Sequence, residues 1–125
     1  MIETKSTPKN GEGVWLWLFK IVSGVLIIVI LIIHLVVNHF VGEGALLTYA
    51  DVVRYYSNPI IPAMEIAFLI LVVSHSLVGV RSILLDLKPS RGLLTAINWV
   101  FTVIGAVSIG YGIWLIMAIV TQNNL

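Results

Sequence analysis

Three histidines lie in or near the long apolar stretches of this 125-residue chain, and their side chains are the best suited to chemistry. His34 and His75 lie deep within such stretches, and His39 lies near the end of the first one. An ionisable side chain inside a membrane is costly, so its presence there indicates a function. Imidazole is also a common ligand of haem iron and of transition metals. The histidines therefore favour a cofactor held between membrane helices.

The composition shows which class of protein contains these histidines. Hydrophobic residues make up 59% of the chain and charged residues only 10%, which predicts an integral membrane protein rather than a soluble domain. The chain has no cysteine, so disulfides, thiolate metal sites and cysteine nucleophiles are excluded. The net charge of +1 gives no reason to expect binding to nucleic acid.

Three apolar stretches are long enough to cross a bilayer, whose hydrocarbon core needs about 20 helical residues. They are predicted to span the membrane at about residues 14–41, 60–85 and 92–120. The first stretch is longer than the apolar core of a signal peptide, so we expect it to be retained. The sequence thus predicts an all-α membrane protein, with a polar segment at residues 1–13 and a single three-helix domain at residues 14–125.

Polar residues at the ends of the stretches predict where the helices begin and how they are oriented. Asn58-Pro59 is a helix-start signal, Glu65 suits the positive end of the following helix dipole, and Ser90 can cap the last helix. The N-terminal side and the second loop hold six of the seven positive charges, which predicts a cytoplasmic N-terminus. These six are Lys5, Lys9, Lys20, Arg81, Lys88 and Arg91.

Four residues of the second stretch are spaced so that they share one helical face. These are His75, Gly79, Ser82 and Asp86, which follow one another at intervals of 4, 3 and 4 residues. Gly79 leaves room for a flat porphyrin beside the histidine, and Arg81 lies where it could pair with a haem propionate. Two alternatives stay open: a histidine that only bonds a neighbouring helix, and charged residues that only end the helix in solvent.

The segment from His75 to Asp86 resembles the second-helix signature of the small membrane anchors of succinate dehydrogenase. In that signature a glycine follows the histidine by four residues and an aspartate follows it by eleven, as Gly79 and Asp86 do here. The resemblance extends to the Ser23-Gly24 pair, to the Asn58-Pro59 entry and to the three-span layout.

This resemblance implies a subunit of succinate:quinone oxidoreductase, the complex II of the tricarboxylic acid cycle. It implies partners: a second three-helix anchor or cytochrome subunit, an iron-sulfur subunit, and a flavoprotein on the cytoplasmic side. FAD and the iron-sulfur clusters would belong to those partners, and His75 would be an axial ligand of haem b. It also implies a bacterial or archaeal cytoplasmic membrane in preference to the mitochondrial inner membrane.

Two departures from the family pattern refine the resemblance. Ser82 stands directly after Arg81, where the cytochrome-type anchor often has a histidine, and this favours the hydrophobic-anchor type. Leu87 follows Asp86, where several members have a tyrosine that contacts quinone. The choice between ubiquinone and menaquinone therefore stays open, with Asp86 and Arg81 as the candidate residues of a quinone pocket.

The positions of the histidines along their helices predict two haems rather than one. At 1.5 Å per residue, His34 lies about 20 Å from the predicted cytoplasmic face of the bilayer core and His75 about 10 Å from it. One haem could not easily use both, whereas two stacked haems could each take one, as in the two-haem branch of the family. His39 points about 140° away from His34. We expect His34 to be the ligand, and His39 to donate to a propionate or to face water.

Three helices are too few to enclose a macrocycle comfortably, so a second anchor subunit is expected to complete the haem-binding bundle. Ala106 and Gly110 form a small-xxx-small spacing, for which we expect packing inside this subunit. Dicarboxylate chemistry is assigned to the partners, because it needs a flavin and a soluble domain. Three alternatives remain: a fumarate reductase anchor, a b-type electron-transfer cytochrome with other partners, and a non-redox assembly or transport subunit.

Overall fold

The computed structural model describes residues 13–40 and 47–122, and it forms these residues into four helices. Their bounds are α1 (Val14–Phe40), α2 (Tyr49–Tyr55), α3 (Ile60–Asp86) and α4 (Arg91–Gln122). Within this part of the chain, α1, α3 and α4 are long and apolar enough to cross a membrane. The all-α fold with three membrane helices is thereby confirmed, whereas the polar segment predicted at residues 1–13 lies outside the described residues except for Gly13.

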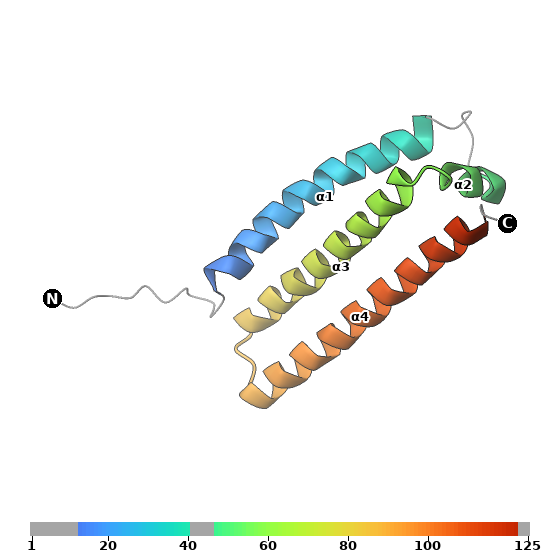
Figure 1. Ribbon diagram of the computed structural model, residues 1–125. Coiled ribbons are helices and arrows are strands. Elements are labelled where there is room, and N and C mark those ends of the chain that lie inside the picture. Colours follow the sequence, from blue (N-terminus) through green and yellow to red (C-terminus); the bar gives the residue numbers. More distant parts are fainter. Residues whose placement is uncertain (1–12, 41–46, 123–125) are drawn as a thin grey trace.

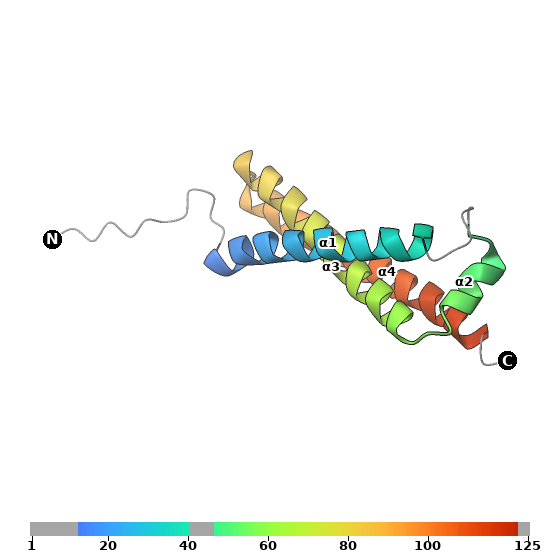
Figure 2. The same ribbon diagram turned by 90° about the horizontal axis from the view of Figure 1, so that it is seen from above.

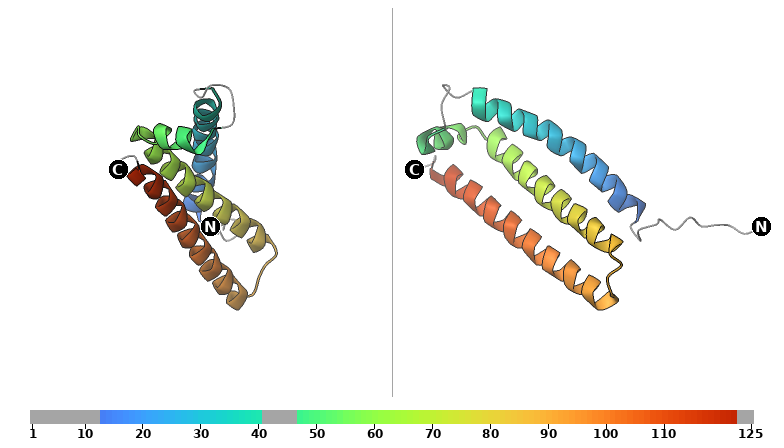
Figure 3. Two further views of the ribbon diagram at one scale, coloured as in Figure 1. Left: turned by 90° about the vertical axis from the view of Figure 1, so that its right-hand side faces the viewer. Right: turned by 180° about the vertical axis from the view of Figure 1, so that it is seen from behind.

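The three long helices lie side by side, with α3 between the other two (Figure 1). Figure 2 shows that α1 crosses over α3. The start of α1 and the connection between α3 and α4 lie at one end, here called the loop end, and α2 lies with the end of α4 at the other, here called the α2 end (Figure 3). The assignment of the loop end to the cytoplasm stays a prediction.

Short polar contacts fix where the helices begin. The side-chain oxygen of Asn58 accepts a hydrogen bond from the backbone N–H of Ile60 at 3.1 Å. The hydroxyl of Ser90 accepts one from the backbone N–H of Leu93 at 3.3 Å, which confirms the predicted cap of α4. Each contact satisfies a backbone donor that a helix start would otherwise leave without a partner.

The short helix α2 was not predicted from the sequence. Its first turn is closed by a capping box, in which the side chain of Thr48 accepts from the backbone of Asp51 and the Asp51 carboxylate accepts from the backbone of Thr48. The pattern Thr-x-x-Asp could have revealed this helix start. At seven residues, α2 lies in the connection between two membrane helices and does not span the membrane.

Two glycines allow α3 and α4 to approach each other. Gly105 is buried, and a Cβ atom added there would lie 3.0 Å from Leu77 of α3. A Cβ atom at Gly112 would collide with Leu69. Ala106 and Gly110 are instead exposed, so the expectation that this pair packs inside the subunit is wrong. The glycines that face α3 are seven residues apart, which is two helical turns.

Candidate functional site

Polar side chains pair across the interface between α1 and α3. Along α1 the contacts follow one another from the loop end toward the α2 end, and along α3 they run in the opposite direction, because the two helices are antiparallel. The three pairs are Lys20 with Ser82, Ser23 with His75, and His34 with Glu65. Two of the three candidate histidines, His34 and His75, thus lie in one interface.

The His75 ring contacts the most deeply buried polar side chain in the described residues, Ser23, which is 1% exposed. Nδ1 of His75 lies 2.9 Å from the Ser23 hydroxyl oxygen. That hydroxyl also lies 2.5 Å from the carbonyl oxygen of Phe19, one turn earlier in α1. Because a hydroxyl has one proton and the carbonyl can only accept, the Ser23 proton goes to Phe19.

This arrangement determines the tautomer of His75. Since the Ser23 proton is used, the Ser23 oxygen accepts the hydrogen bond from Nδ1–H of the imidazole. The other ring nitrogen, Nε2, then carries a lone pair, and among the described residues it has no hydrogen-bond partner. A histidine with Nδ1–H bonded to its surroundings and Nε2 available is the usual form of a metal-bound imidazole.

The space around His75 is shaped by two glycines. A Cβ atom added at Gly24 of α1 would lie 3.3 Å from Cε1 of the His75 ring, so the ring rests directly on the α1 backbone. One turn along α3, a Cβ atom added at Gly79 would meet nothing within 4 Å. Gly24 therefore permits the position of the ring, and Gly79 leaves open space next to it, as the sequence predicts.

His34 is held by a different kind of partner. Its Nδ1 lies 2.9 Å from a carboxylate oxygen of Glu65, whose side chain is 12% exposed. The ring of Phe68, on the same face of α3, lies with its centroid 5.5 Å from that of the imidazole. Glu65 is the sixth residue of α3, beyond the first turn where a helix dipole acts strongly. The helix dipole therefore does not explain why a carboxylate stands at this position, whereas the hydrogen bond to His34 does.

The two histidines lie at different levels of the interface, as the sequence predicts. His75 is level with Ser23 on α1, and His34 lies eleven residues farther along that helix. At a rise of 1.5 Å per residue, this separates the two levels by about 16 Å. The two imidazoles therefore belong to separate sites within the one interface.

The remaining candidate residues do not join either histidine. Nε of Arg81 donates to the side-chain oxygen of Asn98 on α4 at 2.7 Å, so Arg81 faces away from the α1 interface. Asp86 is the exposed last residue of α3 and has no ion pair or hydrogen bond from its side chain to other described residues. His39 is exposed in the last turn of α1.

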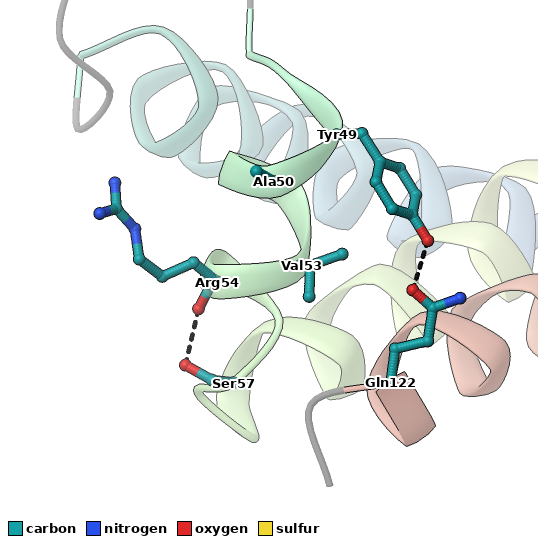
Figure 4. A pocket seen from close by; sticks show the side chains of 6 residues that line it. All are labelled: Tyr49, Ala50, Val53, Arg54, Ser57 and Gln122. Atoms are coloured by element: carbon teal, nitrogen blue, oxygen red, sulfur yellow. Dashed lines mark hydrogen bonds between the residues drawn. The ribbon is translucent and has the colours of Figure 1, made fainter. Parts of the chain in front are cut away.

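A shallow cavity lies at the α2 end, and none of the candidate residues named above is among its described lining residues. It has a volume of about 460 Å³ and is lined mostly by α2, with Gln122 from the end of α4. The Tyr49 hydroxyl donates to the side-chain oxygen of Gln122, which attaches α2 to α4, while the Arg54 side chain points away from that pair (Figure 4). The described residues that line it include no histidine or acidic side chain, and it is separate from the His34 and His75 sites.

Two tyrosines, Tyr55 and Tyr56, end α2 and are close enough to Glu65 for its charge to affect them. Burial and the nearby Glu65 carboxylate raise the pKa of Tyr56 to about 12, so its hydroxyl stays protonated at neutral pH. The hydroxyl of Tyr55 is buried and has no hydrogen-bond partner among the described residues. Its pKa is also raised, by burial and then by the charge of Glu65.

Sequence reasoning assigned no site role to Lys20, Ser23, Glu65 or Asn98, all of which bond a candidate residue or its neighbour. A polar residue inside an apolar stretch is a detectable signal, because an unpaired polar group is costly there. That signal could have identified these residues as paired, but the partner of each depends on how the helices are aligned.

The residues around each imidazole fit a haem iron that would bind one nitrogen of that ring, with a separate iron for each of the two rings. At both sites the protein engages Nδ1, at His75 the other ring nitrogen is available, and Gly79 leaves open space one turn from His75. Within the described residues, histidine and acidic side chains do not gather in groups of three, as a dedicated metal-ion site needs. Haem needs only axial ligands, which separate subunits can supply.

Comparisons with known proteins show the family of this chain. The family model described as "Succinate dehydrogenase/Fumarate reductase transmembrane subunit" matches residues 4–110. The chain is 30% identical over 119 residues to the succinate dehydrogenase hydrophobic membrane anchor subunit of Archaeoglobus fulgidus, covering 95% of this chain and 100% of that protein. It is also 30% identical over 119 residues to the succinate dehydrogenase 2 membrane subunit SdhC of Mycobacterium tuberculosis, covering 85% of this chain and 83% of that protein.

No solved structure gives a significant match. The three apolar helices, together with the archaeal and bacterial sources of these relatives, identify an integral protein of the cytoplasmic membrane. The match covers α1, α3 and much of α4, including both histidine sites. The chain therefore belongs to the family of succinate dehydrogenase/fumarate reductase transmembrane subunits.

Proposed function

We propose that this chain is a haem b-binding membrane anchor of succinate:quinone oxidoreductase, in which electrons pass from an iron-sulfur subunit to quinone. The observation that carries the proposal is the state of the His75 ring. Its Nδ1–H donates to the buried hydroxyl of Ser23, and this leaves the lone pair of Nε2 for a metal. Haem, when bound, supplies a one-electron carrier inside the membrane.

His34 is the proposed ligand of a second haem. Its Nδ1 is engaged by Glu65, and its level differs from that of His75 by about 16 Å along α1. Because this chain provides one histidine at each level, the opposite axial ligands would come from a second anchor subunit. We therefore propose two haems b per pair of anchors.

The proposed partners follow from what the two relatives are and from the chemistry that this chain lacks. Both relatives are named as membrane subunits of succinate dehydrogenase, which supports association with catalytic subunits. Oxidation of a dicarboxylate requires a flavin, and we assign FAD and the iron-sulfur clusters to a flavoprotein and an iron-sulfur subunit. The loop end carries most of the positive charges of the described residues, and we propose that these subunits dock there.

The first test of this proposal is the haem content of the purified complex. We expect a low-spin b-type spectrum and, by pyridine haemochrome analysis, about two haems per anchor pair, since each level of the interface has one candidate ligand. A complex that contains the catalytic subunits but no haem would contradict the proposal. It would leave both histidines as bonds between helices.

Substitution of Gly24 by valine is expected to disturb the haem bound by His75. The added methyl groups would press on a ring that already lies 3.3 Å from the position of a Cβ atom, and the ring would lose its contact with Ser23. We expect loss or a high-spin change of one haem in the optical spectrum. Gly92→Val is the matched control, because a Cβ atom there meets nothing within 4 Å. An unchanged spectrum in Gly24→Val would show that no haem depends on this ring position.

Substitution of Asp86 by leucine is expected to slow quinone reduction. Asp86 is exposed at the loop end, about three turns from His75, and quinone reduction consumes protons that a carboxylate can relay. We expect succinate oxidation with a soluble artificial acceptor, and the haem spectrum, to persist. Leu87→Ala is a control at the neighbouring exposed residue. Unchanged quinone reduction would assign Asp86 to the helix end alone and the pocket to other residues.

The family description includes fumarate reductase, so an anchor of that enzyme is the second candidate function. The two enzymes run one reaction in opposite directions, and the sites described here suit either. Rates of succinate oxidation and fumarate reduction by the purified complex, measured with ubiquinone and menaquinone analogues, distinguish them. The subunits that co-purify would reveal a b-type cytochrome with other partners.

A further inference from the structure

The two membrane histidines differ in the group that accepts their Nδ1 hydrogen bond. At His75 the acceptor is the neutral hydroxyl of Ser23, at 2.9 Å. At His34 it is a carboxylate oxygen of Glu65, also at 2.9 Å. The distances are equal, so the sites differ in the charge of the acceptor.

A carboxylate acceptor changes the imidazole more than a hydroxyl does. Hydrogen bonds to an ionised acceptor are roughly twice as strong as bonds between neutral groups, and a surrounding of low dielectric strengthens them further. The carboxylate draws the Nδ1 proton toward itself, which increases the electron density on the ring and makes Nε2 a stronger donor. A stronger axial donor stabilises ferric over ferrous iron, so it lowers the reduction potential of a haem.

The environment of Glu65 favours this interaction over a role at the protein surface. Its side chain is 12% exposed and lies in the α1–α3 interface, and Phe68 packs against the imidazole from the same helix. A carboxylate in a membrane helix is costly unless a partner compensates it. The imidazole N–H of His34 provides that compensation.

We infer that Glu65 is a positioning residue that orients His34 and increases its donor strength, so that the His34 haem has a lower reduction potential than the same site would have with a neutral acceptor. This inference rests on the proposed haem-binding function. The His75 haem lacks this influence, because its ligand donates to the neutral hydroxyl of Ser23. The two sites of one interface thus differ in potential through the neighbours of their ligands.

The test is a redox titration of the complete purified complex that carries Glu65→Gln. Glutamine has the same shape and its amide oxygen can still accept from Nδ1–H, but it has no charge. We expect both haems to remain by pyridine haemochrome analysis, and the midpoint potential of one haem to rise while the other stays unchanged. The low-spin electron paramagnetic resonance signal of the shifted haem should change as well.

Two further variants identify the haem that responds. Ser23→Ala removes the group that accepts the Nδ1 hydrogen bond of His75 and is the matched control. It should alter only the haem bound by His75. His34→Ala should remove the haem that shifts in Glu65→Gln. If the glutamine variant does not retain that haem, Glu65→Asp is titrated instead: its shorter side chain keeps the charge at a longer distance, so a smaller rise is expected.

The outcomes separate this inference from the proposed function. Two haems with unchanged potentials in Glu65→Gln, or in Glu65→Asp where that variant is needed, would overturn the inference and leave the haem-binding function intact. A shift of the His75 haem would overturn it too. A wild-type complex without haem would instead contradict the proposed function itself.

Discussion

Replacement of His75 by alanine is expected to remove about half of the haem from the complex, because it deletes the Nε2 ligand of one of about two haems. The three membrane helices should still insert, since their apolar composition is unchanged and Ser23 keeps its bond to the carbonyl of Phe19. Pyridine haemochrome analysis measures the loss directly. The optical spectrum would show whether any remaining haem has become high-spin.

The matched control for this change is Ser76→Ala. Ser76 adjoins His75 on α3 but is exposed, and no hydrogen bond joins its side chain to other described residues. This variant should retain both haems with unchanged low-spin spectra. A His75→Ala complex with the full haem content and an unchanged spectrum would show that His75 only bonds Ser23.

Replacement of His34 by alanine is expected to remove the other haem and to leave the His75 haem in place. The two rings lie at levels about 16 Å apart, so the loss of one does not disturb the ligand of the other. Glu65 would also lose the imidazole that compensates its charge, and a lower thermal stability of the complex is expected in addition. Haem content and the unfolding temperature in detergent measure the two effects.

The control variant, His39→Ala, also shows which of the two histidines of α1 is the haem ligand. His39 is exposed in the last turn, and His39→Ala should retain both haems. Loss of a haem in His39→Ala, with none in His34→Ala, would reverse the assignment of the ligand. Haem loss in neither variant would limit the chain to a single haem, bound through His75.

Length and apolar composition alone determine much of this protein. Three largely apolar stretches of more than 20 residues each are long enough to cross the bilayer. They form helices there, because a helix satisfies every backbone hydrogen bond within its own segment. Local rules also predict the Ser90 cap, and helical periodicity predicts that His75 and Ser82 share a face, as their bonds to α1 confirm. The short helix α2 was not predicted, although its capping box depends only on the neighbouring residues Thr48 and Asp51.

Only the tertiary structure decides which residues meet across the helices. Glu65 reads in the sequence as a carboxylate near a helix start, yet it bonds His34 on another helix. Arg81 lies six residues after His75 but turns to Asn98 of α4, and Gly105 and Gly112 face α3 where Ala106 and Gly110 are exposed. These pairings depend on the register and rotation of whole helices, which the packing of complete faces sets. The rules of a single helix determine which residues share a face but not what that face meets.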